Sequence, residues 1–428
     1  MNGPGQSIVS PHLLDALATS EDPETRRMAL NTLTHSSHVR TRRRHHLKAK
    51  IAESSESSSE QRPVFQGFVP DQLLDHVATS QQSDEASREL AKRTLNINQK
   101  LQGDLATSSP TVNDAATSSK LQRRIFDMKN IVQINGRSDE TYKLLPGTLV
   151  RSEGDPPVPD EHANQVYDNS AMVLEFYQQV FGYNFLDDLG APIISSIHYE
   201  NGYQNAQWVG DLARQMIYGD GGSNLYNFTA CLDIIGHEMA HAVTEYICPL
   251  EYEGESGALN EHVSDAFGMM VTLWADKKTT AESDWLIGEG SLMPGVKGIA
   301  LRNMKFPGTA YDDPKFGKDP QPASWAEIEA YKTKHVRWNV YDHGSVHAFS
   351  GVPNRAFVLA AESLGGYCWE TAGKVWWTVL KGKRVSSTCT FVEFADATVD
   401  VARELLGEQA AGLVRNAWDE VGVKKAAA

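Results

Sequence analysis

The sequence His237-Glu238-Met239-Ala240-His241 lies within an apolar segment, residues 229–247, that contains no proline. Hydrophobic residues occur on most sides of this segment, which predicts a helix buried through the middle of a domain. Two histidines four positions apart on a helix project from one face and can bind one metal ion, with Glu238 beside them. A chance pair of packed histidines is the alternative, and the residues that follow decide between the two.

A second predicted helix supplies a third ligand. It follows a turn at residues 253–257 and runs to about Lys277, and Glu261 lies 261 − 241 = 20 positions after the second histidine. Two histidines and one glutamate form the zinc set that keeps one position open. Asn260 and Asp265 are placed to orient the ligands from behind. A solvated helix charge is the commoner role of a glutamate, but it fits poorly beside the apolar neighbours of Glu261.

Residues 237–246 followed by 257–265 resemble the thermolysin-like zinc metallopeptidases. Metzincins have a glycine and a third histidine where this chain has Thr244 and Ile247, and gluzincin aminopeptidases place their glutamate one residue earlier. The resemblance implies one catalytic zinc ion and an endopeptidase that cleaves proteins or peptides. It also implies an α+β fold with a β-rich N-terminal lobe, an α-helical C-terminal lobe and the zinc helix between them.

The resemblance extends to other site residues in the same order along the chain. It implies that Glu238 is the general base, that Tyr252 and His347 stabilise the oxyanion, and that Asp342 holds His347. The residues matched to substrate binding are Asn205, Ala206, Trp208, Arg302, Ile234, Ile287 and Leu301. The first two would bind the substrate backbone by strand addition, and the last three would line a pocket for a bulky apolar residue after the cleaved bond.

Three carboxylates, Asp233, Asp284 and Glu289, match ligands of structural calcium in relatives. Thr272 stands where the family has a glutamate, and residues 277–283 carry an insertion. Because calcium takes six to eight oxygen ligands, we expect at most one weak calcium site, fewer than in thermolysin.

The N-terminal third contains an internal duplication, because residues 8–20 recur as residues 68–80. Each copy is followed by a charged helical pattern, which gives units near 8–34 and 68–96 separated by Ser/Thr-rich linkers predicted to be disordered. The pattern is similar to the short propeptide of protealysin-like enzymes. We expect residues 1–120 to be a duplicated helical pro-region that inhibits the enzyme by covering its cleft until proteolysis removes it. An interaction domain that stays attached is the alternative.

Two catalytic lobes are expected to follow, at residues 121–256 and 257–428. Residues 125–200 alternate turns with short apolar runs at 143–145 and 193–197 and include a helix near 171–181, which predicts a strand-rich lobe. The second lobe is predicted to be helical, and its helices are expected at 356–363, 371–380, 391–406 and 408–421.

Charge argues against nucleic acid as a partner of the catalytic part. The 428 residues carry a formal charge of −15; residues 1–120 contain 14 basic and 14 acidic residues, and the remaining 26 basic and 41 acidic residues carry the whole charge (26 − 41 = −15). An acidic surface repels phosphates. The basic stretch 40–48 is interpreted as a solvated linker, with a nuclear-localisation or nucleic-acid patch as the alternative.

The sequence offers no sign of a membrane partner. No run of about 18 apolar residues occurs, and the first 25 residues lack the basic start and apolar core of a signal peptide. We expect a cytoplasmic enzyme or export by a leaderless route, while the family resemblance leaves secretion open. The four cysteines lack paired metal-ligand spacing, and no disulfide framework is expected in so large a chain with so few cysteines. Cys231 and Cys248 are expected to be buried apolar side chains.

Two other functions are consistent with parts of the sequence. A metallo-aminopeptidase would need acidic residues that hold a free amino terminus, and no such motif is recognised. A catalytically inactive scaffold with an N-terminal interaction module would not need the intact set of His237, Glu238, His241, Glu261 and His347.

Overall fold

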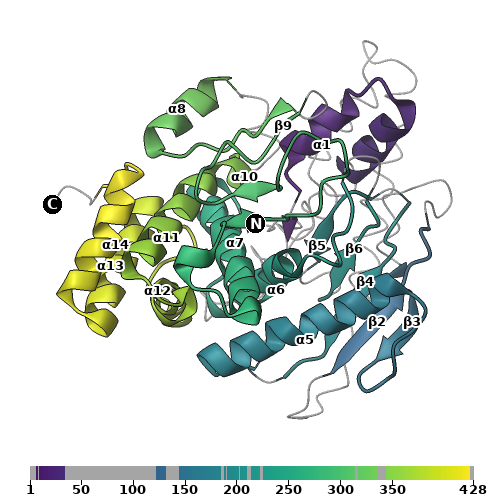
Figure 1. The fold of residues 1–428 in the computed structure, drawn as a ribbon, viewed down its shortest axis with the longest axis horizontal. Coiled ribbons are helices and arrows are strands. Elements are labelled where there is room, and N and C mark those ends of the chain that lie inside the picture. Colours follow the sequence, from purple (N-terminus) through teal and green to yellow (C-terminus); the bar gives the residue numbers. More distant parts are fainter. Residues whose placement is uncertain are drawn as a thin grey trace, which may run out of the picture.

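The computed structural model describes residues 6–7, 9–33, 122–131, 144–184, 188, 190–201, 203–209, 214–221, 225–313, 317–334 and 344–424. The predicted second copy at 68–96, the basic stretch and the Ser/Thr-rich linkers lie outside these residues. A sheet with one long helix forms one lobe, a group of helices forms the other, and the predicted zinc helix lies between them (Figure 1). The predicted two-lobe α+β fold is confirmed.

The β-rich lobe is built on one six-stranded sheet. In spatial order the strands are β1 (Gln6–Ser7), β5 (Ala206–Trp208), β6 (Met216–Tyr218), β4 (Ile193–Ile197), β2 (Arg123–Asp127) and β3 (Thr148–Ser152). β4 runs parallel to β2 and β6, and the other neighbouring pairs are antiparallel. The prediction for 193–197 is confirmed. The apolar run at 143–145 was expected to be a strand, but Leu144 and Leu145 form a turn before Pro146 and Gly147, residues that favour turns.

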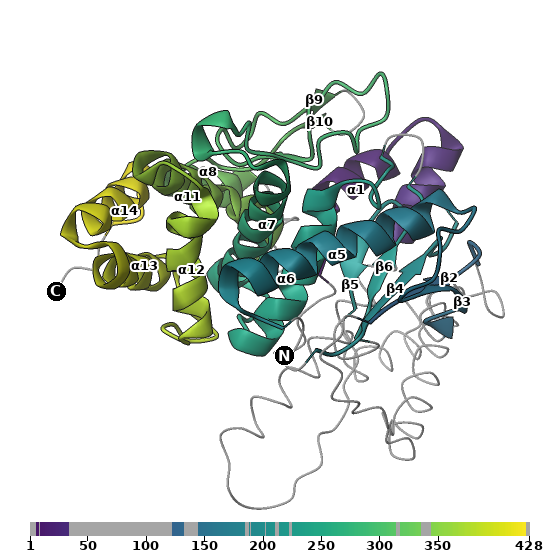
Figure 2. The ribbon, with the colours of Figure 1, turned by 60° about the horizontal axis from the view of Figure 1, so that its bottom comes forward.

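Helix α5 (Glu161–Phe181) packs across one face of the sheet (Figure 2). Asp160 caps its first turn by accepting a hydrogen bond from the Ala163 amide, and Gly182 ends it in the left-handed conformation (φ 63°). The helix begins ten residues before the predicted 171 (171 − 161 = 10), because its buried face continues through Val166 and Ser170.

Helices α6 (Leu232–Ile247) and α7 (Gly254–Asp276) cross at a pair of glycines. A Cβ on Gly236 would lie 2.9 Å from the Gly268 Cα, and a Cβ on Gly268 would lie 2.5 Å from the Asp233 carbonyl oxygen. Only glycine permits backbones to approach this closely. The crossing brings the predicted histidine helix and the predicted glutamate helix side by side.

The second lobe is helical, as predicted. Its helices are α8 (Trp325–Lys334), α10 (Val346–Phe349), α11 (Gly351–Leu364), α12 (Ala372–Lys381), α13 (Phe391–Leu406) and α14 (Glu408–Glu420). The short elements of the same part of the chain are η3 (Thr280–Glu282), η4 (Cys368–Glu370), β7 (Leu286–Ile287), β8 (Arg302–Asn303), β9 (Asp312–Asp313) and β10 (Gly317–Lys318). Stacked Trp376 and Trp418, 6.2 Å apart, lie in the core of this lobe. All four cysteines are buried and free, which confirms the burial predicted for Cys231 and Cys248.

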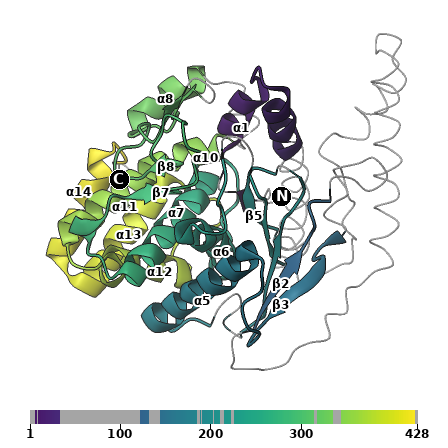
Figure 3. The same ribbon diagram turned by 45° about the vertical axis from the view of Figure 1, so that its right-hand side comes forward.

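The N-terminal segment adds β1, helix α1 (Pro11–Ala18) and a helix at 23–33. Ser10 caps α1, and the next residue is Pro11, which is favoured at the first helical position. The buried face of α1 consists of Leu13, Leu14 and Leu17. Figure 3 shows these purple helices on the side of the molecule where β5 and α10 lie. Among the helices of the described ranges, none is both long and apolar enough to cross a bilayer.

Candidate active site

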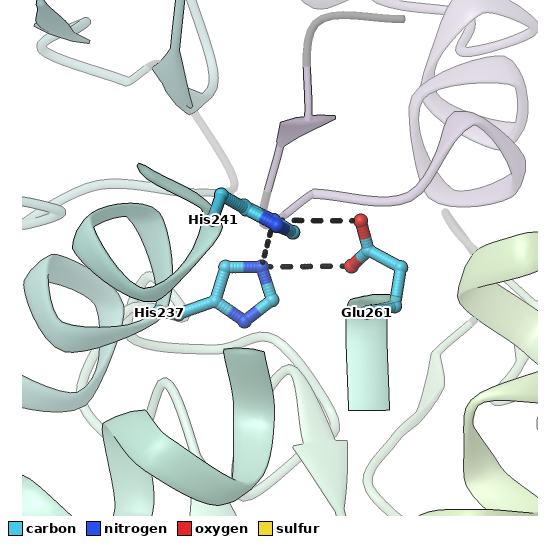
Figure 4. A group of neighbouring side chains, drawn as sticks. All are labelled: His237, His241 and Glu261. Carbon is cyan, nitrogen blue, oxygen red and sulfur yellow. Dashed lines mark hydrogen bonds and ion pairs between the residues drawn. The ribbon is translucent and has the colours of Figure 1, made fainter. Parts of the chain in front are cut away.

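Three buried side chains from α6 and α7 converge on one point (Figure 4). The Nε2 atoms of His237 and His241 lie 3.0 Å apart. The carboxylate of Glu261 places Oε2 3.5 Å from His237 Nε2 and Oε1 3.5 Å from His241 Nε2. Among the residues that the structure describes, this is the one group of three or more histidine, cysteine or acidic side chains close enough to hold a metal ion.

Hydrogen bonds behind the two imidazoles orient both Nε2 atoms toward this point. His237 Nδ1 lies 2.9 Å from a carboxylate oxygen of Asp265, which can only accept a hydrogen bond. His241 Nδ1 lies 2.9 Å from Asn260 Oδ1, and the Asn260 amide donates to the Leu250 carbonyl, which fixes its orientation. Both imidazoles therefore carry their proton on Nδ1, and two Nε2 lone pairs face each other beside a carboxylate.

The ligand spacing fits zinc. Metal–ligand bonds of about 2.0–2.1 Å in a tetrahedral site place ligand atoms about 3.3–3.4 Å apart, close to the 3.0 and 3.5 Å separations of these atoms. Glu261 Oε2 is buried and accepts no hydrogen bond from the described residues. Neutral imidazoles and an ionised carboxylate, each oriented from behind, are the donor set that zinc prefers.

Asp265 connects the metal site to a longer network. Arg302 binds it with two hydrogen bonds of 2.8 and 2.6 Å, and Asn354 donates a third of 2.9 Å. Burial by itself raises the pKa of Asp265, but the Arg302 guanidinium and the hydrogen bond with His237 outweigh burial and hold that pKa well below its usual range. Arg302, matched to substrate binding by sequence, is thus also the partner of a ligand-orienting carboxylate.

The network continues into the helical lobe. Trp376 Nε1 donates to His262 Nε2 at 2.8 Å, so the proton of His262 is on Nδ1, which lies 2.8 Å from Asn354 Oδ1. Burial lowers the pKa of His262 to about 4, so this imidazole is neutral. Hydrogen bonds therefore run without interruption from the Trp376 core to His237.

Glu238 points to the edge of the sheet. Its Oε2 accepts a hydrogen bond of 2.8 Å from the Trp208 amide, and the side chain is fully buried. The Trp208 indole in turn donates to Glu245, one of the polar residues near the end of α6. β5 therefore fixes the predicted base relative to the strand that was predicted to pair with substrate.

Tyr252 and His347 lie beside the metal ligand Glu261. The Tyr252 hydroxyl donates to Glu261 and lies 3.3 Å from His347 Nε2. His347 Nε2 lies 3.6 Å from Glu261 Oε1. The two side chains predicted to stabilise an oxyanion are thus brought together beside the ligand carboxylate. Asp342, predicted to hold His347, lies outside the described residues.

The predicted substrate edge is occupied by the N-terminal segment. β1 pairs antiparallel with β5, with Gln6 opposite Trp208 and Ser7 opposite Gln207. Farther along, the Asn205 side chain binds the Val9 backbone, accepting from its amide at 2.9 Å and donating to its carbonyl at 3.4 Å. Asn205 and Ala206 therefore lie where strand addition was predicted, and the added strand belongs to the same chain.

The residues predicted to line the specificity pocket do not all line one cavity. Leu301 and Arg302 line a cavity together with Ser10, His12 and Leu13 of the N-terminal segment. Ile234 and Ile287 are fully buried, and they are not among the residues lining that cavity.

The carboxylates of Asp233, Asp284 and Glu289 are not brought together as a group of metal ligands in the described part. Asp233 instead accepts hydrogen bonds from the Ile234 and Gly288 amides. The structure therefore gives the predicted calcium site no support, and calcium binding stays a prediction.

Sequence reasoning missed several contributors. Ser264 lies 2.8 Å from His241 Nδ1, and its position one helical turn after Asn260 could have revealed it. Asn354 could not have been found in this way, because 89 residues separate it from Asp265. Thr32 accepts a hydrogen bond of 3.1 Å from the Gln204 amide across 172 positions.

Comparisons with known proteins agree with this geometry. Residues 90–245 match the family described as "Thermolysin metallopeptidase, catalytic domain", and residues 248–423 match "Thermolysin metallopeptidase, alpha-helical domain". Protease PrtS of Photorhabdus sp. (strain Az29) is 39% identical over 365 residues, which are 84% of this chain and 92% of that protein. An extracellular metalloprotease of Pectobacterium carotovorum subsp. carotovorum is 41% identical over 67% of this chain and 79% of its own length.

A solved structure is also similar. The precursor of protealysin, a metalloproteinase from Serratia proteamaculans, has a TM-score of 0.65 and 39% identity and covers 83% of this chain and 99% of its own. Together with the His237, His241 and Glu261 cluster, these matches show that the chain belongs to the thermolysin family of metallopeptidases, in its protealysin-like branch, and that it is a zinc metalloendopeptidase.

Proposed function

We propose that this endopeptidase is made as a zymogen in which residues 6–33 block the substrate site, and that proteolysis of the N-terminal region activates it. The observation that carries the proposal is the pairing of β1 with β5, together with the two hydrogen bonds between the Asn205 side chain and the Val9 backbone. A peptide substrate that added a strand to β5 would need the same backbone groups. The segment and a substrate therefore exclude each other.

Burial anchors the blocking segment. Leu13, Leu14 and Leu17 are at most 2% exposed, and Ala29 and Thr32 of the following helix are fully buried. Each leucine removed from water stabilises the docked state by about 1.5–3 kcal/mol. Because the segment is tethered to the enzyme, it also competes with substrate at a high effective concentration. The similar structure of a protealysin precursor, a form before maturation, is consistent with this arrangement.

We assign the chemistry of peptide cleavage to four groups. Zinc, when held by His237, His241 and Glu261, supplies a Lewis acid that polarises a carbonyl and acidifies water. The Glu238 carboxylate, which the Trp208 amide keeps in place, accepts a proton from the attacking water and delivers it to the leaving amine. The Tyr252 hydroxyl and the His347 imidazole donate hydrogen bonds to the oxygen that becomes negative.

We also propose that cleavage occurs before bulky apolar residues. Leu301 lines the cavity at the docked segment, beside Arg302 and His347. Ile234 and Ile287 would contribute only if substrate binding opened the site toward them, because both are fully buried. Mass spectrometry of a digested peptide library tests this proposal. Cuts that show no preference for an apolar residue on the carboxyl side would contradict it.

The zymogen proposal is tested by following the intact chain and its activity together. The wild-type chain and the Glu238→Gln variant are incubated with zinc, and hydrolysis of a fluorogenic peptide is recorded while mass spectrometry follows the N-terminus. Glutamine keeps an acceptor for the Trp208 amide but cannot act as a base. We expect the rate of the wild type to rise as the N-terminal residues are lost, and the variant to remain inactive and intact. An uncut chain that already works at the rate of the cut chain would overturn the proposal.

A further inference from the structure

We propose that the second copy of the N-terminal unit, residues 68–95, binds the same surface as residues 9–33, so that the cleft has two tethered occupants. This inference rests on the proposed function, in which the first copy blocks the substrate site. It predicts that the loss of the first copy alone leaves the enzyme inhibited.

The two copies align with one short insertion. Their first helical patterns are offset by 68 − 8 = 60 positions, and the second patterns are offset by 91 − 29 = 62 positions, so two extra residues lie in the connection of the second copy. In the first copy that connection, residues 19–24, is mostly exposed. A change of length there does not alter the face that contacts the enzyme.

The buried positions of the first copy are nearly all retained. These positions are Val9, Pro11, Leu13, Leu14, Leu17, Thr25, Ala29 and Thr32, and their counterparts are Val69, Asp71, Leu73, Leu74, Val77, Ser87, Ala91 and Thr94. Valine, both leucines, alanine and threonine are unchanged. Val77 and Ser87 preserve the character of the residues they replace.

The exposed positions of helix 23–33 show the opposite pattern. Pro23, Glu24, Arg27 and Leu30 are exposed, and their counterparts are Glu85, Ala86, Glu89 and Lys92. All four differ, and one is a reversal of charge. The buried positions are thus retained more strictly than the exposed positions of this helix. Val9, Leu13 and Leu14 belong to the same hydrophobic core as residues of the enzyme. The retained apolar face therefore indicates that the second copy fits the same surface.

The polar contacts that hold the first copy are also available to the second. Thr32 accepts the hydrogen bond from the Gln204 amide, and its counterpart Thr94 has the same hydroxyl. Asn205 binds Val9 through backbone groups that Val69 also has. Asp22 accepts hydrogen bonds from Thr25 at the start of the second helix, and Asp84 with Ser87 can repeat this cap.

One difference lies at the entry to the first helix. Ser10 caps α1 in the first copy, whereas Pro70 occupies its place and Asp71 follows. Proline has no side-chain acceptor, so the cap must move to Asp71, a residue type favoured there. We therefore expect the second copy to bind less tightly than the first and to take the surface after the first is displaced.

Four full-length chains test the inference. They are the unaltered chain, Leu13→Asp/Leu14→Asp, Leu73→Asp/Leu74→Asp, and the chain with all four changes. Initial rates of fluorogenic peptide hydrolysis are compared while mass spectrometry verifies that each chain is uncut. We expect both double variants to stay within about twofold of the unaltered chain, and the fourfold variant to be at least about tenfold faster, since buried leucines dominate docking.

The outcomes separate the two proposals. If Leu13→Asp/Leu14→Asp alone reaches the rate of the fourfold variant, the second copy does not bind and this inference is wrong, while the blocking role of the first copy stands. If the unaltered uncut chain is already as fast as the fourfold variant, the blocking role itself fails. A folded fourfold variant that is as slow as the unaltered chain would also overturn the inference.

Disulfide trapping provides a measurement that does not depend on activity. In a Glu238→Gln chain that carries Leu13→Asp/Leu14→Asp, Gln204→Cys is combined with Thr94→Cys, and peptide mapping without reductant detects the bridge. The matched control replaces Thr94→Cys by Lys92→Cys, whose counterpart Leu30 is 48% exposed. We expect a bridge from position 94 and none from position 92. Thr32→Cys with Gln204→Cys in a chain with the leucines intact serves as the positive control, and failure at 94 beside success at 32 would refute the inference.

Discussion

At the scale of single residues, the zinc-binding imidazoles have their proton positions determined by neighbours from α7. His237 has a carboxylate behind it, and His241 has both Asn260 Oδ1 and Ser264 Oγ within 2.9 Å. A metal-bound imidazole whose second nitrogen lacks a partner typically loses a factor of about 10–100 in metal affinity. If one partner is removed, His241 therefore keeps a second acceptor for its Nδ1 proton, whereas the acceptor of His237 is the Asp265 carboxylate.

Because His241 has two acceptors, the effects of removing them on zinc affinity should not be additive. Asn260→Ala and Ser264→Ala should each weaken zinc binding by less than about tenfold, because the other residue still accepts the Nδ1 proton. The double variant should lose more than the product of the two single effects. Zinc dissociation constants measured by chelator competition, in the Glu238→Gln background to prevent self-cleavage, provide the check. Additive losses would show that only one of the two residues serves as the acceptor.

At the scale of elements, the close crossing of α6 and α7 depends on the absence of a Cβ at Gly268. A Cβ on Gly268 would meet the Asp233 carbonyl at 2.5 Å and the His237 amide at 3.0 Å, both of them backbone atoms. Gly268→Ala must therefore separate the two helices. We expect a loss of about 1–3 kcal/mol in unfolding free energy together with weaker zinc binding, since the separation also moves His237 away from Glu261. Gly412→Ala, on α14 where a Cβ meets nothing within 4 Å, is the matched control. Equal urea midpoints for the two variants would contradict this account.

Another prediction concerns the junction between α5 and the sheet. His198 follows β4 and lies 2.7 Å from both Asp220 and Asp160, the residue that caps α5. The hydrogen bond to Asp220 raises the pKa of His198, burial lowers it, and the hydrogen bond to Asp160 raises it further. Together they bring this pKa from an ordinary 6.5 to about 9. A raised pKa stabilises the folded state fully below pH 6.5, and this contribution is lost as pH rises through about 9. Because both carboxylates are about a third exposed, solvent screening limits the contribution to about 1 kcal/mol.

The test compares His198→Gln with the unaltered residue, both in the Glu238→Gln background. Urea unfolding at pH 6.5 and pH 9.5 should show a clear stability difference at the lower pH and a smaller one at the higher pH. A difference that is constant across this range would mean that the charge of His198 does not contribute.

The sequence predicted helices better at their carboxyl ends than at their starts. The end of α7 near Lys277 and all of α13 were predicted from the helical sequence pattern. The start of α5 was missed because polar residues such as Glu161 and Asn164 obscure a buried face that only the sheet reveals. In the site, the ligands from adjacent helices could be predicted from spacing. The contact of Asn354 with Asp265 could not be predicted, and neither could the fact that the first N-terminal copy lies on the substrate edge. Only the tertiary fold brings those residues to the cleft.

At the scale of the whole molecule, the metal site holds the two lobes together. His237 and His241 come from α6, Glu261 comes from α7, and Arg302 links the ligand-orienting Asp265 to β8. A ligand that binds only the folded state stabilises it more as the free ligand concentration rises above the dissociation constant, in proportion to the logarithm of one plus their ratio.

Selective chelation should therefore separate zinc from calcium. Phenanthroline should lower the melting temperature of the Glu238→Gln protein by several degrees, and EGTA, with free zinc buffered, should leave it unchanged. The second expectation follows because Asp233 is engaged by backbone amides instead of gathering with Asp284 and Glu289. A lower melting temperature in EGTA that added calcium restores would establish the weak calcium site that the sequence suggested.

The pairing of β1 with β5 has a consequence for the mature enzyme. A strand at the edge of a sheet presents unpaired backbone groups that can template aggregation, and here the covering strand belongs to the part that we propose is discarded. Maturation would then leave the sheet one strand short. Each bound substrate would add the missing strand for the duration of one turnover. An enzyme without substrate would expose the unpaired backbone groups of β5 to other molecules. We therefore expect concentrated mature enzyme to need a peptide ligand to remain monomeric.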